Sequence, residues 1–274
     1  MTTKQILGEK YILNGNPADV SGYQPDMSAD IYYEVIRIIE GKFLFLEDHL
    51  ERLRHSTSKS GLVFPGGSYI RESLKSLLEE NPIKDGNIRI CLQKSTGPNP
   101  NLLCYFIPRV YLDDSIYLSG VHLVVYPHER PNPGIKKWDD QFRSDVGKFI
   151  RDHGAYEAIL LNKQGEITEG SRSNVFFIDD SNRLITAPEK IILPGITRKY
   201  VIQICRDEHL EVRERPVYMN ELDTLQACFL SGTSPKVLPV RQMDNHPFRS
   251  DHPTVRIIMQ RFEAVMNQNL ETIH

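Results

Sequence analysis

The chain has 274 residues, 40% of them hydrophobic, which suits one large domain or two small ones with an ordinary packed core. Its 33 Lys and Arg residues against 36 Asp and Glu give a net charge of -3, which disfavours a nucleic-acid-binding surface. The sequence has neither an apolar run of membrane-spanning length nor a signal peptide, and its four scattered cysteines form no C-x-x-C pair. We therefore expect a cytoplasmic protein that binds neither nucleic acid nor membranes.

The first half of the chain predicts a hairpin, two helices and three further strands. Residues 30–46 are rich in Ile, Val, Tyr and Phe around a turn at Glu40 and Gly41. A helix is expected from Asp48, which forms a capping-box pattern with Glu51, and a second helix over 69–80. Strands are expected at three apolar runs, 88–94, 102–108 and 121–127. Helices and strands that do not alternate strictly are typical of an α+β fold.

The stretch HERPNPG, residues 128–134, holds two prolines and a glycine and is the best linker candidate. We therefore place the domain boundary there, between a small N-terminal domain, 1–127, and a larger C-terminal domain, 135–274. The C-terminal half predicts a helix that ends near Gly154, strands around 155–162 and 168–178, and a helix over 197–210.

Three short polar stretches lie at the ends of predicted elements. LPGIT, 193–197, opens a helix, and the first N–H groups of a helix lack internal partners, so Ile196 and Thr197 could hold a phosphate. A plain N-cap is the alternative interpretation. TEGSRSN, 168–174, precedes an apolar strand, and SGTSPK, 231–236, follows one. Ligand sites are often built at such positions, although ordinary turns use the same residues.

Six blocks, taken in order, resemble the fold-type IV pyridoxal-phosphate enzymes. They are YEVIR (33–37), HLERL (49–53), GAYEAIL (154–160), TEGSRSNVFFI (168–178), LPGITRK (193–199) and LSGTSPKVLPV (230–240). That class comprises branched-chain aminotransferases, D-amino-acid aminotransferases and 4-amino-4-deoxychorismate lyases. The resemblance covers nearly the whole chain. It implies a two-domain α+β fold, pyridoxal 5'-phosphate between the domains, and a homodimer.

The resemblance also implies which residues contact the cofactor. Arg52 matches the arginine that binds the phosphate, and a guanidinium suits a phosphate dianion. Glu169 matches the carboxylate that faces the pyridine nitrogen and keeps it protonated, so that the ring can accept electrons. The other cofactor-binding positions are Ser171, Ser173, Asn174, Ile196, Thr197 and Thr233. Strand alternation predicts that Arg172 points away from Ser171 and Ser173.

The segment NPGIKKWDD holds two adjacent lysines, Lys136 and Lys137. In the family, a lysine forms the imine with the cofactor's aldehyde and then moves the proton between the substrate and the cofactor. The family's spacing favours Lys136, which stands 18 residues before Gly154, and Lys137 stays as the alternative. If the segment is extended, the two side chains point to opposite faces, so only one can enter a site.

The substrate side of the site has fewer matches. Tyr33 matches a tyrosine that reaches the substrate, and strand alternation groups it with Val35; a core aromatic is the alternative. Ser234 and Lys94 are the further candidates for substrate binding. D-amino-acid enzymes hold the substrate carboxylate with an arginine, for which the best local match is Lys94 or Gln93.

The leading hypothesis is a catalytic aminotransferase that moves an amino group from an amino acid to a 2-oxo acid. Two alternatives share the fold: an aminodeoxychorismate lyase, which eliminates pyruvate to give 4-aminobenzoate, and a non-catalytic cofactor-binding protein. The run WDDQF after the lysines departs from the asparagine and tyrosine of branched-chain members.

Two unrelated chemistries have weak support. Ser56 and Lys59 form an S-x-x-K pattern that occurs in some hydrolases but is common by chance. His49 and His55 are six residues apart, which does not place two metal ligands one helical turn apart. We expect no metal site.

Overall fold

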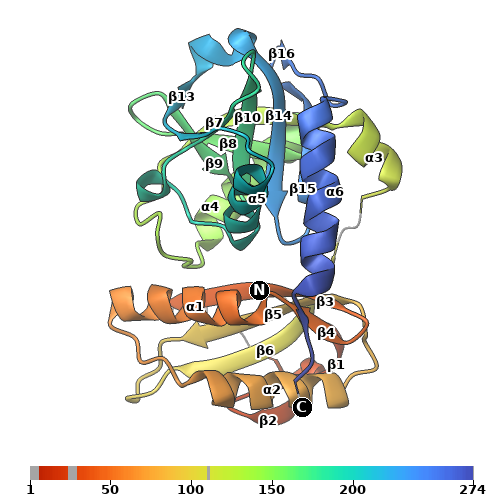
Figure 1. Cartoon of the computed structure of the whole chain (residues 1–274). Coiled ribbons are helices and arrows are strands. Elements are labelled where there is room, and N and C mark those ends of the chain that lie inside the picture. The colour runs from red at the N-terminus through yellow and green to blue at the C-terminus, as the bar shows by residue number, and fades with distance from the viewer. Residues whose placement is uncertain (1–5, 24–29, 110–111, 274) are drawn as a thin grey trace. The chain divides into compact units, whose positions relative to one another are not determined.

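The computed structural model describes residues 6–23, 30–109 and 112–273. The chain divides into two compact units (Figure 1). Unit 1 comprises Met1–Val110, Ile135–Trp138 and Met266–His274; unit 2 comprises Tyr111–Gly134 and Asp139–Val265. Each unit contains one sheet of its own. The boundary at 128–134 stays a prediction, since β7 (Val121–Pro127) belongs to the sheet of unit 2 and 135–138 to unit 1.

Unit 1 is built on a seven-stranded antiparallel sheet of order β17-β4-β3-β5-β6-β1-β2. Its strands are β1 Leu7–Leu13, β2 Asn16–Asp19, β3 Ile31–Ile39, β4 Lys42–Leu44, β5 Gly86–Gln93, β6 Asn101–Ile107 and β17 Leu270–Glu271. A short 3-10 helix, η2, covers Val20–Gly22. The hairpin predicted over 30–46 is confirmed as β3 and β4. Glu40 and Gly41 form its turn at positive φ of 50° and 76°, the conformation that two-residue hairpin turns favour.

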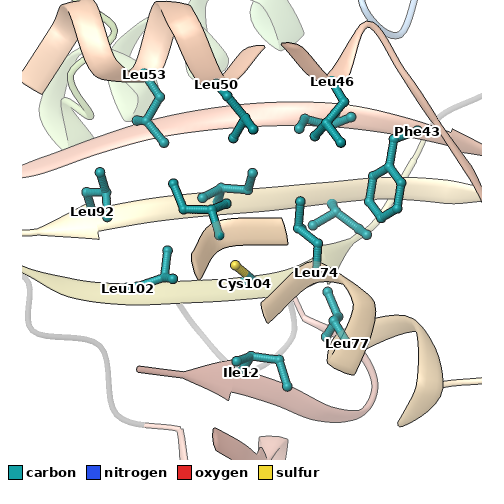
Figure 2. Close-up of a cluster of buried hydrophobic side chains, with 14 of the residues drawn as sticks. Ile12, Phe43, Leu46, Leu50, Leu53, Leu74, Leu77, Leu92, Leu102 and Cys104 are labelled. Carbon is teal, nitrogen blue, oxygen red and sulfur yellow. The ribbon is translucent and has the colours of Figure 1, made fainter. Parts of the chain in front are cut away.

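Two helices cover one face of this sheet and build the core that Figure 2 shows. Leu50 and Leu53 of α1 (Leu46–Ser60) and Leu74 of α2 (Gly67–Glu79) pack on the same cluster of strand residues. The predicted capping box is wrong. Phe45, in the left-handed conformation at φ 55°, precedes the first turn without a side-chain bond, so α1 begins two residues before Asp48.

The other face of the unit 1 sheet carries an aromatic cluster: Tyr11, Tyr23, Tyr33 and Tyr105, with Trp138 packed against it. Residues 135–138 run beside β3, since Tyr33 N–H donates to the Lys136 carbonyl and Trp138 N–H to that of Ile31. Alternation along β3 therefore separates Tyr33 from Ile36 and Ile38, as the sequence predicts.

Unit 2 is built on a ten-stranded sheet of order β12-β11-β10-β14-β15-β7-β8-β9-β13, with β16 on β15. Its other strands are β8 Glu157–Leu161, β9 Glu166–Gly170, β10 Asn174–Asp179, β11 Leu184–Thr186, β12 Val212–Glu214, β13 Val217–Tyr218, β14 Leu225–Gly232, β15 Lys236–Met243 and β16 His246–Pro247. Strands such as β10 and β14 are buried along nearly their whole length, so they are apolar on both faces.

The helices of this half are α3 Asp114–Ser119, α4 Asp140–Asp152, α5 Ile196–Asp207 and α6 Pro253–Gln268, with 3-10 turns η3 Glu189–Ile191 and η4 Met219–Thr224. The predicted helices correspond to α4 and α5, whereas α6 has no counterpart among the predictions. In the described part of the chain, none of the helices has the length and apolar character that crossing a bilayer requires.

Candidate active site

The two adjacent lysines have different surroundings within unit 1. The Nζ of Lys136 lies 3.5 Å from Oε2 of Glu34 and 5.3 Å from the ring centroid of Tyr33, and 15% of its side chain is exposed. The Nζ of Lys137 lies 2.6 Å from Oδ1 of Asp30, and 47% of its side chain is exposed. The segment is extended, as predicted, and only Lys136 has its amine among buried groups.

Glu34 is the centre of the charged groups around Lys136. Its carboxylate is fully buried on the α1 face of β3. Arg52 donates from Nε to Oε1 at 2.6 Å and from Nη2 to Oε2 at 2.7 Å, and the Nδ1 of His49 lies 2.8 Å from Oε2. Since a carboxylate only accepts, His49 donates from Nδ1. Sequence reasoning gave Glu34 no role, although its alternation with Ile36 placed it on the core face.

These contacts decide the ionisation of the group. Burial raises the pKa of Glu34, but the charges of Arg52 and Lys136, with hydrogen bonds from Arg52 and His49, hold it well below its usual value. Burial lowers the pKa of His49, and the hydrogen bond to Glu34 opposes this only in part. Near neutrality the cluster therefore holds one carboxylate, one guanidinium and a neutral imidazole.

Helix α1 distinguishes its arginines as the sequence predicts. Arg52 has 10% of its side chain exposed and points to Glu34, whereas Arg54 is 57% exposed and pairs with Glu51 on the helix surface. The buried hydroxyl of Ser56 accepts a hydrogen bond from the backbone N–H of Lys136 at 3.2 Å. Ser56 of the S-x-x-K pattern thus supports the lysine segment.

Arg89 is a further candidate that sequence reasoning missed. Only 9% of the residue is exposed, and its guanidinium carbon lies 4.5 Å from the ring centroid of Trp138 and 5.8 Å from that of Tyr33. Tyr33 itself is buried and packs edge-on against Trp138 at 5.3 Å. Lys94, by contrast, is exposed just after β5. The signal available was alternation along β5, which puts Arg89 on the face of Cys91, the partner of Tyr33.

Glu169 lies in unit 2 with 3% of its surface exposed. Its Oε1 accepts from Nε of Arg130 at 2.8 Å, and its Oε2 accepts from the backbone N–H of Leu193 at 3.2 Å. Burial raises the pKa of Glu169, and Arg130 and the Leu193 N–H oppose this without cancelling it. Arg130 comes from the segment predicted as a linker, so its role was not foreseen.

The loop after β9 presents two buried serines. Ser171 and Ser173 are 5% and 7% exposed, whereas Arg172 between them is exposed, which confirms the predicted alternation. The buried carboxylate of Glu157 holds the loop, accepting from the backbone N–H of Arg172 at 2.5 Å and from the hydroxyl of Ser171 at 3.3 Å. Glu157 thereby fixes which residues of the loop face inward.

Helix α5 begins in the same unit at Ile196, directly after Gly195. Gly195 makes no side-chain cap, and a Cβ there would lie 2.0 Å from Oδ1 of Asn174, so no larger residue fits. Asn174 donates from Nδ2 to the Leu193 carbonyl at 2.9 Å, which secures the turn. The first-turn N–H groups and the buried Thr197 therefore form an anion-binding helix start without a cap from Gly195.

Two hydroxyl groups of unit 2 are buried with no hydrogen-bond partner among the described residues: those of Ser173 and Ser231. Asn174 and Ser231 are paired across β10 and β14, next to the turn that carries Thr233 and Ser234. Buried polar groups are nearly always satisfied, so unpartnered ones indicate a missing ligand or water. This donor set fits a phosphorylated, hydrogen-bonding cofactor.

The fold and these residues define a class of protein: a two-sheet α+β enzyme with a buried lysine and arginine in one unit, and a buried carboxylate and an anion-binding helix start in the other. The model of the amino-transferase class IV family matches residues 32–243. The chain therefore belongs to the class IV aminotransferase family. This confirms the resemblance and the assignment as a pyridoxal-phosphate-dependent aminotransferase of fold type IV.

Individual relatives agree with this family. A D-alanine aminotransferase from Bacillus licheniformis is 28% identical over 244 residues, which cover 85% of this chain and 84% of that protein. A probable branched-chain-amino-acid aminotransferase from Aquifex aeolicus is 45% identical over 225 residues, covering 74% and 70%. The branched-chain aminotransferase structure from Escherichia coli matches with a TM-score of 0.86 at 23% identity, covering 98% of this chain and 100% of that one. The predicted fold is confirmed over nearly the whole chain.

Proposed function

We propose that this aminotransferase carries its cofactor on Lys136 and moves the amino group of an amino acid to a 2-oxo acid. The observation that carries the choice of lysine is the contrast in exposure, 15% against 47%, together with the contacts of Lys136 to Glu34 and Tyr33. Pyridoxal phosphate supplies an aldehyde and an electron-withdrawing ring when bound. One of the similar solved structures is that of a Thermus branched-chain enzyme described with pyridoxamine 5'-phosphate.

The cofactor's phosphate would be held by two kinds of donor. Arg52 offers a charged guanidinium, and the start of α5 offers the N–H groups of Ile196 and Thr197 together with the positive end of the helix dipole. Thr233 would add a hydroxyl from the turn between β14 and β15. Ser171, Ser173 and Asn174 would line the cofactor, which gives the buried hydroxyl of Ser173 a role.

Glu169 would receive the pyridine nitrogen. The two donors that already reach its oxygens, Arg130 and the Leu193 N–H, orient the carboxylate. The raised pKa of Glu169 brings its affinity for a proton closer to that of a ring nitrogen, so the two groups can share one. Lys136, once released from its bond to the cofactor, would take the proton from the substrate carbon and return it.

The substrate would lie on the side of Tyr33. Arg89, in the aromatic cluster with Tyr33 and Trp138, supplies the cation that the search for a carboxylate clamp in the sequence did not find. Lys94 is exposed, and Ser234 lies in the β14–β15 turn, so both stay predictions. The relatives named as aminotransferases support transfer over the lyase reaction, which the same residues could also serve.

A half-reaction tests this proposal. Holoenzyme given an amino acid alone should lose its visible cofactor absorbance and release the matching 2-oxo acid in a 1:1 ratio. Lys136→Ala should lower this rate by more than about 10⁴-fold, because it removes the group that moves the proton. Lys137→Ala, the matched control, should retain it. Release of pyruvate from aminodeoxychorismate without an oxo-acid acceptor would support the lyase instead.

We further propose a homodimer in the cytoplasm. Family resemblance supports the dimer, and the four cysteines, all free and buried, support a reducing compartment. Size-exclusion chromatography with light scattering should give twice the 31.5 kDa chain mass. A fully active monomer would contradict the dimer.

A further inference from the structure

One buried carboxylate, that of Glu34, contacts both cations that the proposed function uses in unit 1. Oε1 receives Nε of Arg52, and Oε2 receives Nη2 of Arg52 and Nδ1 of His49, with Nζ of Lys136 3.5 Å away. The contacts come from three separate stretches of chain: strand β3, helix α1 and the segment 135–138. Glu34 is thus the group that these stretches share.

The geometry limits what Arg52 can do. A guanidinium presents its donors along fixed edges, and the edge formed by Nε and Nη2 is engaged by Glu34. Any phosphate must then meet the Nη1 side. Without Glu34, the long side chain of Arg52 could adopt other rotamers, and ordering them again on binding would reduce affinity. The same reasoning applies to Lys136, whose four-carbon side chain is held at one end by Ser56 through its backbone N–H.

His49 fixes the carboxylate in turn. The imidazole is 1% exposed and donates from Nδ1, so it adds a directed hydrogen bond without adding a second charge. Tyr33 and Asp48 also act electrostatically on Arg52, and both favour its charged form. The charged and titratable groups around Glu34 are therefore Arg52 and Lys136 as cations, His49 as a neutral donor, and Tyr33 and Asp48 at the edge.

We propose that Glu34 is a positioning residue, which holds the guanidinium of Arg52 and the amine of Lys136 in the arrangement that the cofactor requires. The inference rests on the proposed roles of Arg52 and Lys136 and adds a residue that acts through both. Its action is on the two cations, so removing it should weaken cofactor binding through Arg52 and alter the protonation behaviour at Lys136.

Apoenzyme titrated with pyridoxal phosphate provides the first test. Glu34→Gln should weaken binding by about tenfold or more, because a neutral amide loses the charge-assisted bonds to Arg52. Glu51→Gln is the matched control: Glu51 pairs with Arg54 on the exposed face of the same helix and should bind as wild type. Pyridoxal, which lacks the phosphate, should show a smaller loss in Glu34→Gln. Equal losses for both compounds would overturn the action on Arg52.

A double-mutant cycle separates positioning from general damage. If Glu34 acts through Arg52, the variant with both Glu34→Gln and Arg52→Gln should bind pyridoxal phosphate nearly as well as Arg52→Gln alone. Losses that multiply would show that the two residues act independently and would overturn the inference. Glu34→Asp keeps the charge with a shorter reach, and it should recover part of the affinity; this variant also serves if Glu34→Gln does not fold.

A spectroscopic pH titration reads the action on Lys136. Loss of the nearby negative charge disfavours the protonated nitrogen, so the pH at which the bound cofactor's visible absorbance changes should fall by about one unit in Glu34→Gln. An unmoved transition would contradict this part. Peptide mapping of wild-type enzyme after borohydride reduction is independent of Glu34, so a label away from Lys136 would refute the proposed function, whereas the cycle tests Glu34 alone.

Discussion

Glu34 in unit 1 and Glu169 in unit 2 are both buried carboxylates, at 0% and 3% exposure, and yet their pKa values move in opposite directions. Burial raises the pKa of both. Glu34 has a bidentate arginine, a histidine and a lysine around it, and these outweigh the burial. Glu169 has a single bond from Arg130 and one backbone N–H, and these do not.

The difference shows how one chain makes two functional carboxylates from the same amino acid. Glu34 stays ionised and serves as a fixed anchor for cations. Glu169 keeps a higher affinity for protons, which suits a group that faces a ring nitrogen. The number of donors on each carboxylate, more than its burial, determines which of the two roles it can have.

The largest expected effect comes from removing the main partner of Glu34. Arg52→Leu should lower the free energy of unfolding by about 3–5 kcal/mol, because it leaves a buried carboxylate without its bidentate cation. Arg54→Leu, on the exposed face of α1, should leave stability unchanged. Urea denaturation of the two apo variants measures the contrast. Similar midpoints would show that the Glu34 cluster is not a stabilising unit.

The two carboxylates should also respond to pH with opposite signs. The pKa of Glu34 is lowered from 4.5 on folding, so its stabilisation is present above that pH and is lost as the pH falls through the folded-state value. The pKa of Glu169 is raised from 4.5, so its favourable contribution is present below that pH and is lost as the pH rises through the folded-state value.

Glu34→Gln should therefore lose about 1–3 kcal/mol relative to wild type at pH 7 and much less near pH 3. Glu169→Gln should gain relative to wild type as the pH rises from 4 to 7. Urea midpoints of the apo forms across this range provide the measurement. Parallel pH curves for the two variants would contradict the comparison.

Arg130 provides a smaller and more specific change. Its charge lowers the pKa of Glu169, so Arg130→Gln should raise that pKa further, by about one unit. The acid limb of the pH profile for kcat should move up by a similar amount. Arg143→Gln, on the partly buried face of α4 in the same unit, is a suitable control and should not move it. An unchanged profile in Arg130→Gln would remove Arg130 from the site.

The smallest expected effect concerns Ser231. Its buried hydroxyl has no partner among the described residues, so Ser231→Ala should leave the stability of the apoenzyme unchanged within about 0.5 kcal/mol. If the hydroxyl serves the cofactor, affinity for pyridoxal phosphate should nevertheless fall several-fold. Loss of stability with unchanged affinity would show that the hydroxyl has a structural partner instead.

The sequence predicts most of what depends on local pattern. Alternation correctly separates Ser171 and Ser173 from Arg172, and Arg52 from Arg54, because strand and helix periods determine which face a residue lies on. It fails where the partner comes from a distant segment. Glu34 lies on the core face by alternation, but only folding brings Lys136, about a hundred positions later, to its carboxylate.

Other features were missed because local and tertiary preferences disagree. The pattern at Asp48 and Glu51 predicts a capping box, yet the tight turn after β4 puts Phe45 in the left-handed conformation and starts α1 earlier. Arg130 lies among prolines that indicate a linker, so nothing local marks it as the partner of Glu169. Arg89 is one charged residue in an apolar strand, and only the aromatic rings around it indicate a function.

The central claim is that Lys136, held beside Glu34, is the lysine that binds the cofactor. Borohydride reduction of the holoenzyme, followed by proteolysis and mass spectrometry of the peptides, tests it most directly. We expect the reduced cofactor on Lys136 alone, with Lys137 unmodified. A label on Lys137, or on a lysine outside 135–138, would contradict the account.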